Sequence, residues 1–542
     1  MSDSTSISPQ GAAAVIQTDY RIGQDNLQPR LGPFSLDIHN PVFVISGVTI
    51  IVFVVFALAL PAQAEAFFGW LRPALTSTFD WFFLLAGNIF VLVALAVMLS
   101  PLGKIRIGGA DATPDYSYTG WFAMLFAAGM GIGLMFFGVA EPISHYEAAL
   151  AADAGSPDSW APLAGAEGNQ AEARRLGMAA TIFHWGLHPW AIYAVVGLSL
   201  ALFAYNKGLP LSVRSMFYPI FGERIWGWTG HIIDTLAVFA TLFGLATSLG
   251  IGAEQANAGL EFLFGIPVND VSKVLLITGI TAIAVASVVA GLDRGVKRLS
   301  EINMVLAALL LLFVIAAGPT LAILTGFFTN LVAYAEYLPA LSNPLGRDDD
   351  NFRQDWTSFY WAWWISWSPF VGMFIARVSR GRTVRAFVFS VLLVPSLVSV
   401  LWMTAFGGTA ITMLNEGYQA IADAALELKL FAMLDPLPLA GITSFIGIVL
   451  VVVFFVTSSD SGSLVIDTIT AGGKVDAPLA QRVFWAIFEG LVAIALLLGG
   501  GLGALQAASV STGLPFAIVL LLGCFALVKG LLAEPRKRHA AA

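Results

Sequence analysis

The residues with the clearest chemical meaning are the aromatic side chains between Trp356 and Phe370. Trp363, Trp367 and Phe370 recur at helical spacing, so they share one stripe of a helix, with Trp364 on its flank. Aromatic belts at the membrane interface explain many Trp residues in membrane helices, and core packing explains others. Indole faces that converge on a dry site without an acidic residue instead suit a quaternary ammonium group, which has no hydrogen-bond donor. The string therefore predicts a binding site for a methylated onium compound.

A second aromatic group surrounds Pro189. Proline has no N–H to donate to the carbonyl of Trp185, so we expect the helix to kink here. A kink changes the directions in which Trp185 and Trp190 point. Trp190 and Tyr193 are i, i+3 neighbours on one helix face.

Three glycines, Gly129, Gly131 and Gly133, occupy every second position of an apolar run. Each costs a helix about 1 kcal/mol relative to Ala, and backbone leaves helical geometry within a membrane only where it lines a cavity. The freed carbonyls would then be able to bind a cation. Close helix packing through Gly129 and Gly133 is an equally good interpretation of the glycines alone.

A quieter feature is the pair of hydroxyls at Thr457 and Ser458, one turn beyond Phe454. Hydroxyl and carbonyl oxygens suit a hard cation, as the calcium and magnesium rules illustrate. Considered alone, hydroxyls that bond back to their own helix are the preferred interpretation.

The histidines His184 and His188 are spaced i, i+4 and could in principle hold a metal. The sequence offers no carboxylate or third histidine near them, so helix-packing histidines with hydrogen-bonded rings are the preferred interpretation. No other Asp, Glu or His cluster in an apolar run has metal-ligand spacing. This pattern gives little support to a proton relay or to a membrane enzyme.

These residues must be positioned by membrane helices. The chain has 542 residues, of which 58% are hydrophobic and 11% charged, against about 25% charged in soluble proteins. A soluble enzyme, a secreted disulfide domain and a disordered chain are thereby excluded, and the one cysteine, Cys524, can form no intrachain disulfide. Twelve apolar runs are long enough to span a bilayer. They cover residues 41–61, 81–100, 119–140, 178–204, 231–260, 271–291, 302–328, 357–378, 384–411, 438–466, 481–502 and 508–530.

Charge supports this count and gives it an orientation. With the N-terminus inside, most Lys and Arg residues fall in inside segments, as the positive-inside rule requires. Residues 1–38 are polar and without an apolar core, so we expect a mobile cytoplasmic tail and no cleavable signal peptide. Residues 209–225 and 329–345 are expected to form helices on the inner and outer surfaces.

The sequence resembles the betaine–carnitine–choline transporter family over residues 35–530. The strings WAWWISWSPFVGMFIARVSRGRT (361–383), GMGIGLMFFGVAEP (129–142) and FHWGLHPWAIY (183–193) carry the resemblance. It implies an all-α membrane protein of twelve transmembrane helices with two inverted five-helix repeats, an amino-acid/sodium symporter-like fold. The expected parts are tail 1–38, two extra helices in 39–110, first repeat 111–328, outer helix and loop 329–355, second repeat 356–530 and tail 531–542.

The resemblance implies a binding site for the substrate's trimethylammonium group among Trp185, Trp190, Tyr193 and Trp364. Two further indoles line the same path, and four residues of the glycine run approach the substrate carboxylate through their backbone. These residues are Trp363 and Trp367, and Gly129, Met130, Gly131 and Gly133. Members with Gly at position 133 resemble glycine betaine carriers, whereas members with Asp there resemble choline carriers.

Sodium is the expected coupling ion, and no organic cofactor is expected. The resemblance implies one sodium site made of carbonyls and hydroxyls from Ala127, Met130, Phe454, Thr457 and Ser458. A second would use Thr241 and Phe370, but Leu245 here replaces the second hydroxyl, and Thr247 or Ser248 would have to compensate. The family also implies a homotrimer in the bacterial inner membrane, with both termini cytoplasmic and no nucleic-acid partner.

Several functions remain open at this point. Within the family, choline, carnitine, dimethylsulfoniopropionate or ectoine are alternatives to glycine betaine as substrate, and a sodium-independent exchanger is an alternative mechanism. A pore or a betaine receptor without transport is a rival of another class. The short C-terminal tail gives no reason to expect strong osmotic activation.

Overall fold

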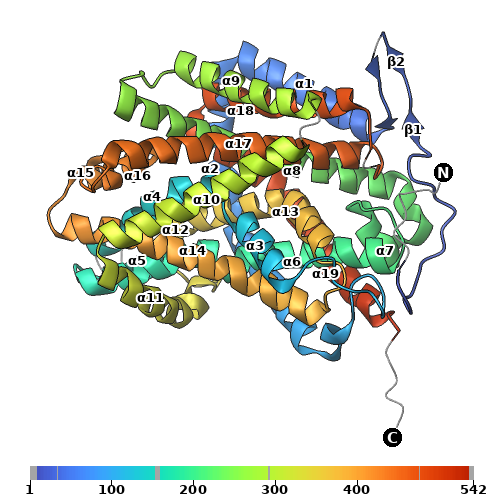
Figure 1. Ribbon diagram of the computed structural model, residues 1–542, viewed down its shortest axis with the longest axis horizontal. Helices are drawn as coiled ribbons and strands as arrows, with labels where there is room; N and C mark the ends of the chain where they lie inside the picture. Colours follow the sequence, from blue (N-terminus) through green and yellow to red (C-terminus); the bar gives the residue numbers. More distant parts are fainter. Residues whose placement is uncertain (1–8, 33, 153–158, 291–292, 475, 536–542) are drawn as a thin grey trace, which may run out of the picture.

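The computed structural model describes residues 9–32, 34–152, 159–290, 293–474 and 476–535. The expected cytoplasmic ends 1–8 and 536–542 lie outside the described residues. Within them the chain is almost entirely helical, and the long helices run side by side along the long axis of the molecule (Figure 1). In the described part of the chain, the strands form two antiparallel pairs near the N-terminus, β1 (Asn26–Leu27) with β4 (Ile38–His39) and β2 (Arg30–Leu31) with β3 (Phe34–Ser35).

Among the described residues, fifteen long α-helices and four short ones account for most of the remainder. The long helices are α1 (Val42–Ala59), α2 (Pro61–Leu99), α3 (Tyr118–Gly129), α4 (Ile132–Ala151), α5 (Gln170–Trp185), α6 (Leu187–Ala201), α8 (Trp228–Phe264), α9 (Asp270–Val289), α10 (Asp293–Ala317), α11 (Thr320–Leu341), α13 (Ser358–Val378), α14 (Val384–Asn415), α17 (Ala440–Thr470), α18 (Leu479–Leu498) and α19 (Gly501–Leu532). The short helices are α7 (Tyr218–Phe221), α12 (Asp350–Phe352), α15 (Ala420–Asp423) and α16 (Lys429–Leu434).

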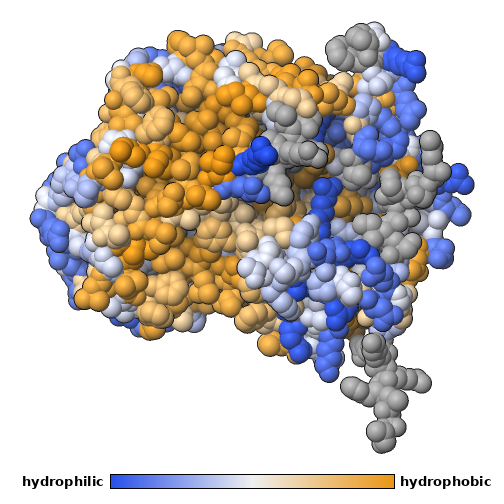
Figure 2. Space-filling view, viewed as in Figure 1, coloured by the Kyte–Doolittle hydropathy of each residue, from blue (hydrophilic) through white to orange (hydrophobic). Residues whose placement is uncertain are grey.

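The predicted number of spans agrees with these helices. Eleven described segments are long and apolar enough to cross a membrane, or twelve when the bent pair α3 and α4 is taken as one span. Large apolar side chains cover the surface between two hydrophilic ends (Figure 2), among them Val52, Leu275 and Leu321, all more than 60% exposed. Exposure of so much apolar surface to water would be unfavourable, and the helices are long enough to cross a bilayer. The chain is therefore a multi-pass membrane protein.

Two helices are assigned differently from the expectation. The central helix α13 is not among the candidate spans, because its Trp and Ser residues lower its hydropathy, whereas α11 is among them. We expected one span over 302–328 and a separate surface helix over 329–345. The structure instead ends α10 at Ala317 and continues from Thr320 to Leu341 as one helix. Pro319 lies between them and cannot continue the hydrogen bonds of α10, so the boundary falls there and not at residue 328.

The described part of the N-terminal tail is docked, contrary to the expected mobile tail. In this N-terminal strap (residues 9–40, without residue 33), Gln10 N donates to Gly108 O at 2.8 Å and Ile16 N donates to Lys207 O at 2.9 Å. The Tyr20 ring stacks on Trp226 at 4.1 Å. Backbone hydrogen bonds to distant loops fix the strap, and sequence hydropathy gives no indication of them.

The segment 209–225 also differs from the expected surface helix. It forms short turns around α7, and Met216 and Phe217 in it are fully buried. Arg214 is buried as well, with its guanidinium Nε 2.5 Å from the carboxylate of Asp234. Burial of both apolar and charged residues explains why the segment does not form a continuous amphipathic helix.

The core lies around α13. This helix packs against α6, α8, α19 and α2, while α4 packs against α5 and α14 on one side of it. Trp361 and Trp363 of α13 are almost completely buried, at 0% and 2% exposure. The middle of the aromatic string is therefore surrounded by protein and is not an interfacial belt.

Candidate functional site

The glycine run breaks its span in two. Helix α3 ends at Gly129 and α4 begins at Ile132, with axes that differ by 61°. Met130 (φ −91°, ψ 134°) and Gly131 (φ −174°, ψ −176°) are extended between them. Because α4 starts at the break, the N–H groups of its first turn have no helical carbonyl to bond to. The break therefore exposes backbone N–H groups as well as carbonyls.

The span that contains Pro189 is also broken, at Gly186, three residues before the proline. Helix α5 ends at Trp185 and α6 begins at Leu187, with Gly186 (φ −100°, ψ −123°) between them. The missing N–H of Pro189 explains why the carbonyl of Trp185 is released at this point. The Tyr334 hydroxyl of α11 accepts the freed N–H of Leu187 at 3.2 Å.

The aromatic residues of the two strings form one wall. Trp363 and Trp364 are stacked at 5.0 Å, and Trp185 meets Trp364 edge to face at 4.9 Å. Tyr193 lies 6.3 Å from Trp364 and 5.3 Å from Trp190, as ring centroids. This aromatic wall closes one side of a pocket. The pocket is lined by residues 128–134, Trp185, Pro189, Trp190, Tyr193, Ser248, Trp363, Trp364, Trp367, Val371 and Ser399.

The indole N–H groups of the wall are bonded to other parts of the protein. Trp364 donates to His184 O at 2.9 Å, and Trp367 donates to Gly244 O at 2.9 Å. Trp363 donates to the Ser248 hydroxyl at 3.1 Å. None of the residues that line the pocket is Asp, Glu, His, Lys or Arg. These three rings therefore contribute aromatic surface to the pocket while their donors are used elsewhere.

The glycine run lies directly against this wall. A Cβ atom added at Gly133 would come within 2.7 Å of Trp185 Cη2 and 3.0 Å of Trp363 Cη2. At Gly129 it would lie 3.5 Å from Trp190 Cζ2. The predicted substrate residues on α4, α5, α6 and α13 thus surround one pocket, and the glycines allow the backbone to approach the rings.

The predicted sodium ligands are bonded within their own segments. Met130 N donates to Ala127 O at 3.3 Å. The Thr457 hydroxyl donates to Val453 O at 3.0 Å and to Phe454 O at 3.3 Å, which is the back-bonding that the sequence alone favoured. The predicted ion ligands are Ala127 O, Met130 O, Phe454 O and the hydroxyls of Thr457 and Ser458. We call this set the oxygen donors.

Residues next to the two halves of this donor set contact the same residue of α8. A Cβ atom added at Gly252 would meet Ile132 of α4 at 3.0 Å and Val451 of α17 at 3.4 Å. Ile132 follows the oxygen donors of the glycine run, and Val451 lies about one turn before Phe454. The start of α4 and the middle of α17 are thus held on the same residue of α8.

The two residues expected at the second ion site have protein neighbours of their own. The Thr241 hydroxyl donates to Ala237 O at 2.7 Å, and Phe370 lies 5.3 Å from Trp367. The Thr247 hydroxyl, offered as a replacement for the one lost at Leu245, lies 2.9 Å from both Leu505 O and Ser509 Oγ of α19.

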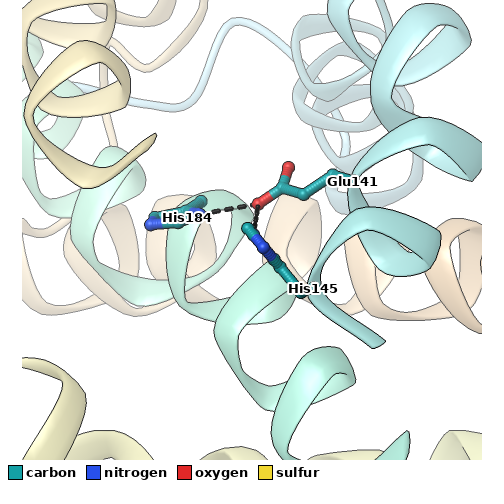
Figure 3. Close-up of side chains that lie close together, drawn as sticks. All are labelled: Glu141, His145 and His184. Carbon is teal, nitrogen blue, oxygen red and sulfur yellow. Dashed lines mark hydrogen bonds and ion pairs between the residues drawn. The ribbon is translucent and has the colours of Figure 1, made fainter. Parts of the chain in front are cut away.

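The structure also contains a buried polar cluster that sequence analysis missed. Glu141 Oε1 lies 2.6 Å from His184 Nδ1 and 3.1 Å from His145 Nε2 (Figure 3). Glu141 Oε2 accepts the indole N–H of Trp185 at 2.7 Å and the hydroxyl of Tyr360 at 2.5 Å. The conclusion that the apolar runs hold no such cluster is therefore wrong. The i, i+4 spacing of Glu141 and His145 was visible, but His184 comes from another helix.

The pair His184 and His188 does not act as a unit. His188 turns to Asn88, with its Nε2 3.0 Å from Asn88 Oδ1, and its ring stacks on Trp361 at 5.3 Å. Hydrogen-bonded packing is thus the arrangement of His188. His184 instead joins the cluster with Glu141.

Comparison with known proteins agrees with these features. The pattern that defines the betaine/carnitine/choline family transporters matches residues 41–536. A glycine betaine/proline/choline transporter of Vibrio parahaemolyticus is 66% identical over 532 residues, which are 97% of this chain and 96% of that protein. A glycine betaine transporter of the same organism is 55% identical, covering 96% and 98% of the two chains. A glycine betaine transporter of Bacillus subtilis is 43% identical, covering 85% and 88%. The chain therefore belongs to the betaine/carnitine/choline transporter (BCCT) family.

Proposed function

We propose that this transporter carries glycine betaine or a closely related methylated zwitterion. The observation that carries the proposal is the pocket between the aromatic wall and the broken span. Methyl groups of a quaternary ammonium offer no hydrogen bonds, and they are held by ring faces through cation–π attraction. Trp185, Trp190, Tyr193 and Trp364 would form the cage, with Trp363 and Trp367 beside it.

The opposite side of the pocket suits the other end of a zwitterion. Residues 129–133 line it, and the first turn of α4 starts there at Ile132. Free N–H groups and the positive end of the helix dipole favour a carboxylate at such a position. A zwitterion brings both charges with it, which agrees with a lining that has no charged side chain.

We further propose sodium symport by alternating access. A sodium ion would replace the internal hydrogen bond of the Thr457 hydroxyl and would be held by Ala127 O, Met130 O, Phe454 O, Thr457 and Ser458. Such an ion would join the glycine run to α17 and so favour one state of the pocket. Entry of one sodium ion down 100 mV would contribute roughly 2.3 kcal/mol. Thr241 and Phe370 would supply a weaker second site.

The setting is part of the same proposal. We place the protein in the bacterial inner membrane with both termini in the cytoplasm, and as a homotrimer. The distribution of Lys and Arg supports the orientation, and family membership supports the assembly.

Uptake by purified protein in vesicles tests the function. We expect labelled glycine betaine to accumulate only with an inward sodium gradient, and faster when the vesicle interior is negative. Undiminished accumulation after complete replacement of sodium by potassium would contradict sodium coupling. Binding without accumulation would instead indicate a receptor.

Choline is the second candidate substrate. The 66% identical relative is named for glycine betaine, proline and choline, and an aromatic cage accepts any trimethylammonium group. Competition of labelled glycine betaine uptake by choline, proline, carnitine, dimethylsulfoniopropionate and ectoine would rank the substrates. Stronger competition by choline than by unlabelled glycine betaine would overturn the assignment of a zwitterion.

A further inference from the structure

We propose that Glu141, His145 and His184 form a binding site for one divalent transition-metal ion of the zinc class, directly behind the aromatic wall. One ligand atom from each residue lies within 4.8 Å of the other two. Two imidazoles and one carboxylate are a ligand set that zinc uses in proteins, with a fourth position left for water. The site lies outside the substrate pocket, and the proposal does not depend on which substrate is carried.

The surroundings of the three ligands are those expected of a metal site. Metal-binding histidines and carboxylates are usually oriented by hydrogen bonds from a second layer of residues. Here His184 Nε2 lies 2.9 Å from the Thr357 hydroxyl. Glu141 Oε2 is held by Trp185 and Tyr360, so Oε1 is the oxygen that faces both imidazoles.

When no ion is bound, N–H protons of the two imidazoles fill the space between the three ligands. Glu141 Oε1 then accepts N–H groups from His184 Nδ1 and His145 Nε2. A neutral imidazole can bind a metal at these nitrogens when its proton moves to the other ring nitrogen. For His184 that proton would lie on Nε2 and point at Thr357 Oγ1. Metal binding thus needs a change of tautomer and a widening of the 2.6 Å contact, because two ligand atoms that each lie about 2.0–2.2 Å from a tetrahedral zinc ion are roughly 3.3 Å apart.

The site is dry. Glu141 and His184 are 0% exposed and His145 is 1% exposed. The ring of Trp356 lies 4.7 Å from that of His145, and Phe352 lies 5.1 Å from it. An apolar shell strengthens the attraction between a divalent cation and the carboxylate. We expect slow binding, since the ion must enter when the surrounding helices open.

A bound ion would affect the aromatic wall through one shared carboxylate. The same Glu141 that offers Oε1 to the metal holds the indole of Trp185 through Oε2. Trp185 contacts Trp364 at 4.9 Å. Metal binding would fix Trp185 in one position, so we expect zinc to lower the maximum rate of transport without competing with substrate.

Cobalt(II) is a suitable probe, since its visible absorption reports a low-coordinate site of nitrogen and oxygen ligands. The full chain should be purified without a polyhistidine tag, titrated with cobalt and then with zinc. We expect about one cobalt per chain, its bands removed by equimolar zinc. No bands and no tightly bound zinc at micromolar concentrations would overturn the proposal, while leaving the transport proposal untouched.

His145→Ala and His145→Phe should weaken cobalt binding at least tenfold. Retained glycine betaine binding by each variant would show that it is folded, and the Phe variant keeps a ring in the space. His188→Ala is the matched control, because His188 lies one turn from His184 but bonds to Asn88. We expect its cobalt affinity to equal that of the unmodified chain. Equal loss in the His145 and His188 variants would place the metal elsewhere and overturn the site.

Discussion

The aromatic wall and the oxygen donors are built in opposite ways. In the wall, side chains from α5, α6 and α13 already meet around one pocket, and the indole N–H groups of Trp364 and Trp367 are bonded outside it. Among the oxygen donors, Thr457 bonds to its own helix and Ala127 O accepts a bond from Met130. The wall is thus preformed, whereas an ion cage would have to be assembled from groups that are satisfied without it.

This difference suggests a division of labour. A preformed wall loses little conformational entropy on binding and gives affinity. Donors that exchange an internal hydrogen bond for an ion respond to the ion, and they can therefore couple it to the position of the broken span. Substitutions in the two regions should separate substrate affinity from sodium dependence.

Removal of one ring from the wall should have the largest effect. We expect Trp364→Leu to weaken glycine betaine binding about 30-fold or more, because a desolvated ring contributes about 2 kcal/mol to cation binding. Intrinsic fluorescence or uptake competition would measure the loss. Trp70→Leu is the control, since Trp70 is 64% exposed on α2. Unchanged affinity in Trp364→Leu would show that the wall does not hold the substrate.

Removal of the hydroxyl donors should act on sodium and not on the substrate. In Thr457→Ala combined with Ser458→Ala, we expect the sodium concentration for half-maximal uptake to rise about tenfold, because the two lost oxygen ligands cost about 0.7 kcal/mol each. Glycine betaine affinity at saturating sodium should change far less.

Thr443→Ala is the matched control for this pair. Thr443 also bonds back to its own helix α17, with its hydroxyl 3.2 Å from Leu439 O. If the control and the double variant raise the sodium requirement equally, loss of back-bonding and not loss of an ion ligand is the cause.

A methyl group at Gly133 tests how closely the broken span fits the wall. In Gly133→Ala the new carbon would lie 2.7 Å from Trp185 Cη2, so the rings must shift. We expect glycine betaine affinity to fall about fivefold, in line with overpacking costs of 1–3 kcal/mol. Gly279→Ala on α9 is the control, because nothing lies within 4 Å of a Cβ atom there.

Gly133→Asp adds a charge at the same place. The sequence resemblance predicts a relative gain for choline, a cation without a carboxylate of its own. The measurement is the ratio of choline to glycine betaine affinity, compared with that of Gly133→Ala. An equal ratio in the two variants would show that the steric shift, and not the charge, controls selectivity.

What the sequence predicted well was local. Gly129, Gly131 and Pro189 break helices through their own backbone chemistry, so the breaks at Met130–Gly131 and at Gly186 follow from short strings. The stripe of Trp363 and Trp367 follows from helical periodicity in the same way. Each of these features depends on residues within about two turns of one another.

What the sequence did not reveal depends on contacts between distant segments. The cluster of Glu141 with His184 joins residues 43 positions apart, and the anchor of Trp367 is a carbonyl of α8. Hydropathy also extended one span over 302–328, whereas α10 ends at Ala317 and α11 runs from Thr320 to Leu341, since an apolar run does not show where one helix ends and the next begins. The N-terminal strap was missed for the same reason, because it is polar and its partners lie elsewhere in the chain.

The strap should have the smallest effect on transport. His39 in β4 is buried, and burial together with the nearby guanidinium of Arg214 lowers the pKa of His39 from 6.5 to about 3. The docked strap therefore favours neutral His39, so docking is strongest above pH 6.5 and weakens as the pH falls from 6.5 towards 3. At pH 5 the loss is about 2 kcal/mol.

Hydrogen exchange of the strap measures this loss. The amide of Ile16, bonded to Lys207 O, should exchange faster at pH 5 than at pH 7.5 after correction for intrinsic rates. In His39→Gln this pH dependence should disappear. We expect glycine betaine affinity to stay nearly constant over the same range, because the aromatic wall makes its contacts without the strap. A parallel fall in affinity would mean that the wall is not preformed but depends on the docked strap.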